Sequence, residues 1–135
     1  MKFELFKFEN VTSTNDEAIN LIKNKKSEIG CVYAKNQSKG RGTQGKSWIS
    51  QSGNFFCSIF FPLKSEYPPF NEFSLINPII ISNVMQNFFK KENITFKWPN
   101  DIFANKKKNL WHFTRTYNFK QKRIFNYWYR NKYCI

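Results

Sequence analysis

The sequence predicts an α+β fold, in which helices pack on a β-sheet. Two observations lead to this class. Short segments rich in aromatic and β-branched residues predict strands, and two segments with apolar residues at helical spacing predict helices. Their order is strand, helix, strand, glycine-rich loop, strand, helix and strand, and no internal repeat is visible. A chain of 135 residues is expected to form one domain around one core.

The first half of the chain contributes two strands and a helix. Residues 3–8 alternate apolar and charged side chains, which predicts a half-buried opening strand. Thr14 and Glu17 have capping-box spacing just before apolar residues at helical intervals, so a helix is expected over residues 15–24. Residues 31–34 predict a short buried strand.

The second half of the chain also alternates strands with a helix. Residues 55–61 predict an aromatic-rich strand that ends at Pro62, and residues 94–98 predict a further strand. Residues 74–90 predict an amphipathic helix, with Pro78 tolerated in its first turn. The apolar residues that set this helical spacing are Leu75, Ile76, Ile79, Ile80, Val84 and Phe88.

The net charge of +13 suggests nucleic-acid binding, because such proteins neutralise phosphates with Lys and Arg. Most of this charge is in the tail. Residues 105–135 hold 9 basic and no acidic residues, whereas residues 1–104 carry a net charge of +4. A basic nucleic-acid-binding module remains an alternative for the tail alone, where basic residues lie among aromatic ones. No specific nucleic-acid partner is expected.

Neither a signal peptide nor an apolar run of membrane-spanning length is visible, so a cytoplasmic protein without membrane contact is expected. The three cysteines, Cys31, Cys57 and Cys134, lack the Cys-x-x-Cys spacing of zinc or redox sites. Buried free thiols are the expected state.

A glycine-rich basic loop is the first candidate for chemistry. Gly40, Gly42 and Gly45 allow backbone N–H groups to face a phosphate or carboxylate, and Arg41 and Lys46 add positive charge. The pattern is neither a Walker loop nor a dinucleotide-binding fingerprint. Taken alone, such a loop is more often an ordinary connection, so both interpretations stay open at this point.

The loop occurs together with two other motifs, Ser13-Thr14-Asn15 before it and Lys97-Trp98-Pro99-Asn100-Asp101 after it. In this order the three motifs resemble the catalytic domain of biotin protein ligases, and the resemblance runs from about Phe8 to Lys108. It implies a mixed β-sheet with helices packed on one face, incomplete at the C-terminus. A lipoate-type ligase, from the related class, is the alternative.

The resemblance implies an activity with ATP and Mg²⁺. Biotin is activated as biotinyl-AMP and then passed to a lysine of a carrier protein, the biotin carboxyl carrier domain of acetyl-CoA carboxylase. Adenylation places a good leaving group on an otherwise inert carboxylate.

The resemblance also implies the residues of the site. Hydrogen bonds to the ureido ring of biotin are expected from Ser13, Thr14, Asn15 and Gln37. The biotin carboxylate and the adenylate phosphate are expected to contact Arg41, Gly42, Thr43 and Lys108. ATP or adenylate contacts are expected from Gly40, Arg41, Lys46, Trp48, Lys97, Asn100 and Asp101, and Asp101 is also the candidate Mg²⁺ ligand. Without the resemblance, helix capping is the favoured explanation for Ser13, whereas for Thr14 capping and ligand contact can hold at once.

After Lys108 the sequence departs from the family pattern. Reading one base later across Trp111 and His112 forces a glycine codon, and AT-rich codon choices then restore family motifs in order. An extra adenine in the run encoding residues 106–109 explains both this restoration and the acid-free tail. The chain is therefore interpreted as a partial catalytic domain (1–108) followed by an out-of-frame basic aromatic tail (109–135), and the fragment is expected to be inactive.

Overall fold

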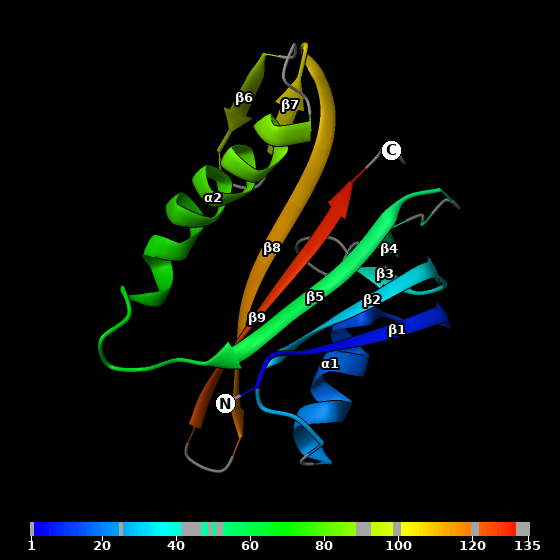
Figure 1. Cartoon of the computed structure of the whole chain (residues 1–135), viewed down its shortest axis with the longest axis vertical. Coiled ribbons are helices and arrows are strands. Elements are labelled where there is room, and N and C mark those ends of the chain that lie inside the picture. Colours follow the sequence, from blue (N-terminus) through cyan, green and yellow to red (C-terminus); the bar gives the residue numbers. More distant parts are fainter. Residues whose placement is uncertain are drawn as a thin grey trace.

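The computed structural model describes residues 2–24, 26–41, 47–48, 50, 53–88, 93–98, 101–119 and 122–131, with the backbone alone for 41, 47–48, 88, 107–119 and 122–131. Its main feature is a seven-stranded sheet with the order β1-β2-β5-β9-β8-β7-β6 (Figure 1). The strands are β1 (Glu4–Val11), β2 (Gly30–Gln37), β5 (Phe55–Pro62), β6 (Ile94–Lys97), β7 (Asp101–Ala104), β8 (Lys107–Phe119) and β9 (Lys122–Asn131). The helices are α1 (Thr14–Lys23) and α2 (Phe73–Phe88), and a 3-10 turn, η2 (Phe70–Glu72), leads into α2.

The sheet is mixed. β1 and β2 run parallel, joined through α1, whereas each of the other neighbouring pairs is antiparallel. A parallel pair needs a crossover connection, which the helix supplies. The predicted α+β class is confirmed, and the predicted strands and helices appear with bounds that differ by a few residues.

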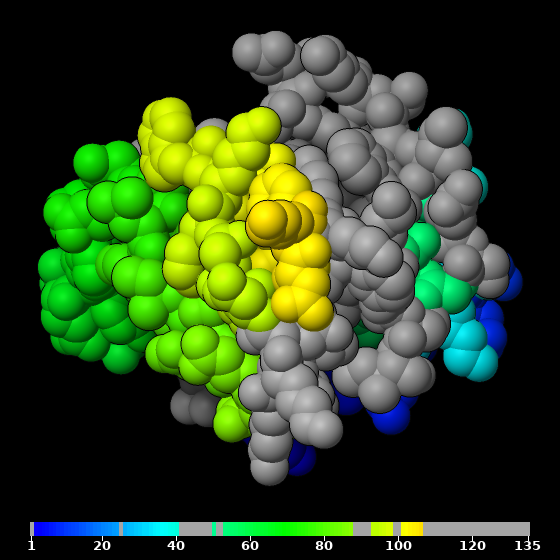
Figure 2. All heavy atoms as spheres, turned by 90° about the horizontal axis from the view of Figure 1, so that it is seen from above, coloured from blue at the N-terminus to red at the C-terminus, as the bar shows by residue number. Residues whose placement is uncertain are grey.

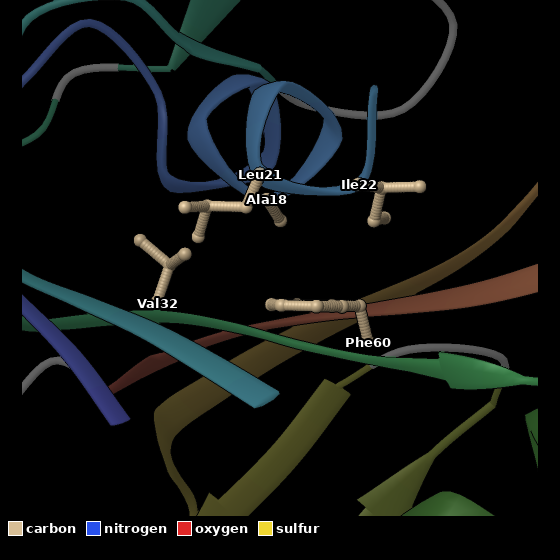
Figure 3. Packing of buried hydrophobic residues seen from close by; sticks show 5 residues of the cluster. All are labelled: Ala18, Leu21, Ile22, Val32 and Phe60. Carbon is tan, nitrogen blue, oxygen red and sulfur yellow. The ribbon is translucent and has the colours of Figure 1, made fainter. Parts of the chain in front are cut away.

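The core lies between α1 and the sheet (Figure 3). Ala18, Leu21 and Ile22 point from the helix toward Val32 of β2 and Phe60 of β5, and all five side chains are buried. Leu21 and Ile22 lie three and four residues after Ala18, which places all three on one face of α1. Burial of these apolar side chains attaches the helix to the strands whose ends form the candidate site.

α2 packs against the opposite face of the sheet. Phe73 of α2 contacts Ile59 of β5, whose side chain points away from that of Phe60, and Met85 packs against Ile102 of β7. The expectation of helices on one face therefore does not describe these two helices. Alternation along β5 offers apolar residues to both faces, so each face can hold a helix.

The exposed side of α2 is also apolar. The spacing of the apolar residues predicted that they would form the buried face of the helix, but several of them are exposed. Leu75, Ile79, Ile80 and Val84 are each more than half exposed, whereas Phe73 and Met85 are buried, as are two polar residues between them, Asn77 and Ser82. Pro78 is the sixth residue of the helix and so lies beyond its first turn. Figure 2 shows α2, in green, along one rim of the molecule beside β6 and β7.

The backbone of the tail lies inside the sheet. β8 and β9 form an antiparallel hairpin, and β9 pairs with β5 from Phe55↔Asn131 to Pro62↔Ile124. β8 begins at Lys107, so the backbone passes the proposed boundary at 108/109 within one strand. Among the described residues, no helix is long and apolar enough to cross a membrane.

Candidate functional site

The site begins where the N-terminus of α1 meets the end of β2. The backbone N–H of Thr14 donates to Gln37 Oε1 over 3.0 Å, and the Thr14 hydroxyl approaches the same oxygen at 3.4 Å. Thr14 is fully buried and Gln37 nearly so. This contact satisfies one of the N–H groups that the first turn of a helix leaves unpaired. Two of the predicted site residues are therefore held together away from water.

The predicted capping box, with Thr14 as the N-cap residue, is wrong. Ser13, not Thr14, is the N-cap residue, and its side chain makes no capping hydrogen bond. The Thr14 side chain is instead part of the contact with Gln37. The physical reason is a tertiary partner: an amide oxygen from β2 takes the place of a local cap. Ser13 is itself buried, and Asn15 is half-buried on the first turn.

Two serines extend this polar cluster. Ser58, fully buried on β5, donates from Oγ to Thr14 Oγ1 over 3.0 Å. Gln37 donates from Nε2 to Ser50 Oγ over 3.2 Å. The result is a connected row of hydrogen bonds across α1, β2 and β5, from Ser58 through Thr14 and Gln37 to Ser50. Buried polar groups of this kind need partners, and each one here has at least one.

A hollow of about 440 Å³ opens beside Gln37. It is lined by the ends of the parallel strands β1 and β2 and by Glu17 of α1. Ser38 and Lys39 continue past β2 and donate their backbone N–H groups to Val11 O and Thr12 O, over 3.0 and 2.7 Å. These bonds fix the chain where it enters the glycine-rich loop.

The two ends of the loop are paired. β3 (Gly40–Arg41) and β4 (Ser47–Trp48) form a short antiparallel ladder, with Gly40 opposite Trp48 and Arg41 opposite Ser47. Among the site residues predicted here, Gly42, Thr43 and Lys46 lie outside the described residues, as do the side chains of Arg41 and Trp48. The loop therefore starts within three residues of Gln37, in agreement with a site that joins both.

Lys97 and Asp101 are brought together by the β6–β7 hairpin, in which they are register partners. Asn100 lies outside the described residues, and Lys108 is described only as a backbone position of β8, opposite Phe103. β7 is four strands from β2 in the sheet, which corresponds to roughly 19 Å across a flat sheet. The structure thus forms two groups of candidate residues, and an elongated ligand is needed to contact both.

The donor set for a metal is sparse. Within the part of the chain that the structure describes, no group of three or more His, Cys, Asp or Glu side chains could hold an ion. Mg²⁺ commonly binds through one or two carboxylates together with substrate phosphates, so a half-buried Asp101 fits this ion when a phosphate supplies the remaining oxygens.

Ser50 and Ser58 were missed by the sequence analysis. Ser58 carried a signal: it is the one hydroxyl residue within the otherwise apolar run Phe55-Phe56-Cys57-Ser58-Ile59-Phe60-Phe61. A hydroxyl in a buried strand needs a partner, so its position predicts a polar contact. Ser50 follows the loop without any distinguishing pattern.

Solved structures of ligases resemble this chain. A biotin protein ligase from Leishmania major in complex with biotin is 26% identical, with a TM-score of 0.72, and the match covers 92% of this chain and 55% of that one. A biotin protein ligase from Aquifex aeolicus in complex with biotin and ATP is also 26% identical, with a TM-score of 0.70 and coverage of 93% and 51%. The chain thus spans a little over half the length of these ligases.

A lipoate-bound protein, LipL1 from P. falciparum, shares the fold with a TM-score of 0.58 at 13% identity, covering 96% of this chain and 47% of that one. A model of the family described as Biotin/lipoate A/B protein ligase matches residues 5–109. This range contains both groups of candidate residues and the loop between them. The chain belongs to the Biotin/lipoate A/B protein ligase family.

Proposed function

We propose that the parent activity of this chain is ATP-dependent ligation of biotin to a carrier-protein lysine. The observation that carries this proposal is the buried contact between Thr14 and Gln37, because a polar pair held away from water suits a ligand head with hydrogen-bonding groups. Two similar structures at 26% identity hold biotin, one of them together with ATP, which supports biotin over lipoate.

The site residues would divide the ligand between them. Ser13, Thr14, Asn15 and Gln37 would bind the ureido head, and the loop from Gly40 to Trp48 would supply backbone N–H groups and basic side chains to the carboxylate and the adenylate phosphate. Lys97, Asn100 and Asp101 would contribute to nucleotide binding, and Asp101 would hold Mg²⁺ together with phosphate oxygens. Biotinyl-AMP is elongated, as the separation of β2 and β7 requires.

The reaction has two steps. A carboxylate oxygen of biotin attacks the α-phosphorus of ATP, the bond to the β-phosphate oxygen breaks, and pyrophosphate leaves. The ε-amine of the carrier lysine then attacks the acyl carbon, the C–O bond to phosphate breaks, and AMP leaves. Positive charge from Arg41, Lys46 and Lys108 would stabilise the negative charge that develops on phosphate. The carrier proposed is the biotin carboxyl carrier domain of acetyl-CoA carboxylase.

The test is binding of labelled biotin and labelled lipoate to the whole chain by equilibrium dialysis, with and without ATP. Biotin is expected to bind and lipoate to remain free. Gln37→Ala should weaken biotin binding, while Lys35→Ala, at an exposed position of the same strand that does not line the hollow, should leave it unchanged. Binding of lipoate in preference to biotin would make this a lipoate-type ligase, and binding of neither would reject ligand recognition by this chain.

We also propose that residues 109–135 are translated out of frame and that the present chain is an inactive fragment. The family match ends at residue 109, immediately after three successive Lys residues. Sequencing of the gene and its transcripts across codons 106–109 tests this. A uniform run in the given frame, with no adenylation by the purified chain, is the expected result. Adenylation by the purified chain would contradict the proposal.

The basic tail as a nucleic-acid-binding module remains the alternative from another class. The pairing of β9 between β5 and β8 gives the tail backbone a structural role instead. The test is elution of the chain from immobilised single-stranded DNA with increasing salt. If the chain stays bound at high salt, the alternative is favoured. If it elutes at modest salt, the binding reflects net charge alone.

A further inference from the structure

Ser58 occupies an unusual place for a hydroxyl. It is fully buried between two apolar neighbours, Cys57 and Ile59, on a strand whose remaining residues are four phenylalanines and Pro62. Burying a hydroxyl costs free energy unless it is hydrogen-bonded, and here its partner is the side chain of Thr14, 44 residues earlier in the chain. A long-range bond of this kind, made to a candidate site residue, indicates a role in the site.

The direction of each hydrogen bond in this row follows from the chemistry of the groups. A backbone N–H can only donate, so the atom of Gln37 that faces Thr14 N must be the amide oxygen. The Thr14 hydroxyl has a single hydrogen, which it donates to the same Oε1. Its oxygen therefore accepts the hydrogen of Ser58.

This order determines which end of the Gln37 amide is presented. With Oε1 turned inward toward Thr14, Nε2 faces outward, where it donates one hydrogen to Ser50 Oγ. An amide nitrogen carries two hydrogens. Among the contacts of the described residues, Ser50 is the one acceptor for Gln37 Nε2, which leaves its second hydrogen for a ligand.

We propose that Ser58 is a positioning residue: through the Thr14 hydroxyl it holds Gln37 with its amide nitrogen toward the ligand, so the site selects a head group that presents a hydrogen-bond acceptor. The inference rests on the proposed function. The ureido carbonyl oxygen of biotin is such an acceptor. The dithiolane ring of lipoate offers only weakly accepting sulfur atoms, so the same arrangement disfavours lipoate.

The first experiment compares Ser58→Ala with Ser82→Ala, a matched control. Ser82 is also a buried serine, but its hydroxyl donates to the backbone oxygen of Ile79 in α2. Ser58→Ala is expected to weaken biotin binding about tenfold, since one buried hydrogen bond that orders the site is lost. Ser82→Ala should leave biotin binding unchanged. Equal binding by both variants would overturn the proposal.

A double-mutant cycle with Thr14→Val separates positioning from general destabilisation. If Ser58 acts through the Thr14 hydroxyl, adding Ser58→Ala to Thr14→Val should cause little further loss of biotin binding. If the two substitutions weaken biotin binding by independent factors that multiply, Ser58 does not act through the Thr14 hydroxyl.

A ligand-free measurement keeps this inference distinct from the proposed function. Amide hydrogen exchange is followed for Thr14, whose N–H bonds Gln37, and for Glu17, whose N–H bonds Ser13 O in the same helical turn. Ser58→Ala should accelerate exchange at Thr14 more than at Glu17. If the unmodified chain fails to bind biotin, the proposed function is rejected. If exchange accelerates equally at both amides, the positioning role of Ser58 is rejected.

Selectivity for an acceptor is tested with 2-iminobiotin, whose protonated head presents N–H donors in place of the carbonyl oxygen. The unmodified chain should prefer biotin to this analogue. Gln37→Glu replaces the outward N–H donor with a carboxylate oxygen and should reverse the preference. An unchanged preference for biotin in Gln37→Glu would show that Gln37 does not hydrogen-bond the ureido carbonyl oxygen.

Discussion

The backbone N–H of Thr14 and the side-chain oxygen of Gln37 lie 3.0 Å apart, although 23 residues separate them in the sequence. This bond joins the start of α1 to the end of β2 and substitutes for a local helix cap. Removing its acceptor takes away the hydrogen bond that Gln37 makes with this buried N–H. Gln37→Ala should therefore lower the free energy of unfolding by about 1–3 kcal/mol, measured by urea denaturation.

The control for that measurement is Asn36→Ala. Asn36 is exposed and its side-chain nitrogen bonds Asn10 Oδ1, so its loss should change the free energy of unfolding by about 0.5 kcal/mol or less. If the two variants unfold at the same urea concentration, the Thr14–Gln37 bond does not stabilise the fold.

Gly30 is required by close packing between β1 and β2. A Cβ atom at this position would lie 2.7 Å from the backbone oxygen of Glu4, and 3.1 Å from the ring of Phe60. Because the nearest atom is backbone, the clash is relieved only by separating the strands. Gly30→Ala should destabilise the chain by about 1–3 kcal/mol in urea denaturation. A variant as stable as the parent would mean that β1 shifts freely against β2.

Asn77 is a polar residue on the buried side of α2. Its Nδ2 atom is buried and has no hydrogen-bond partner among the described residues. Asn77→Leu removes this unpaired group and should raise the free energy of unfolding by about 1–3 kcal/mol. Asn87→Leu, on the exposed side of the same helix, controls for helix propensity and should change it far less. Equal effects of the two substitutions would attribute the gain to propensity alone.

Cys31 and Cys57 lie on paired strands, and both are buried free thiols. A hydrogen bond from Cys57 lowers the pKa of Cys31, while the same bond and burial raise the pKa of Cys57 well above its usual range. Since the thiolate is the reactive form, Cys31 should be alkylated by iodoacetamide before Cys57 at pH 8. Peptide mass spectrometry in a Cys134→Ser background measures the order.

Cys57→Ala removes the hydrogen-bond donor from this pair. Without the hydrogen bond from Cys57, the Cys31 thiolate loses its stabilising donor, so the pKa of Cys31 should rise and its alkylation at pH 8 should slow. Faster alkylation of Cys31 in this variant would mean that access, and not ionisation, controls its reactivity.

The sequence by itself determined the local structure and the motifs. Alternation and helical spacing predicted the order of strands and helices as far as residue 98, because these periods follow from backbone geometry and do not depend on distant residues. The strands β7, β8 and β9 were not predicted. The position of the glycine-rich loop between two strands was equally local. The position of Ser58 in an apolar strand also predicts that its hydroxyl needs a hydrogen-bond partner. The sequence does not indicate that this partner is Thr14.

Only the tertiary structure decided which residues contact one another. α2 is apolar around most of its circumference, so spacing could not tell that Leu75 and Ile79 would be exposed while Phe73 and Met85 were buried. Which side of such a helix packs depends on the sheet beneath it. Likewise, Thr14 carries a capping signal that Gln37 overrides, because the amide oxygen from β2 accepts the N–H of Thr14 in the buried interior, where an unpaired N–H would be costly.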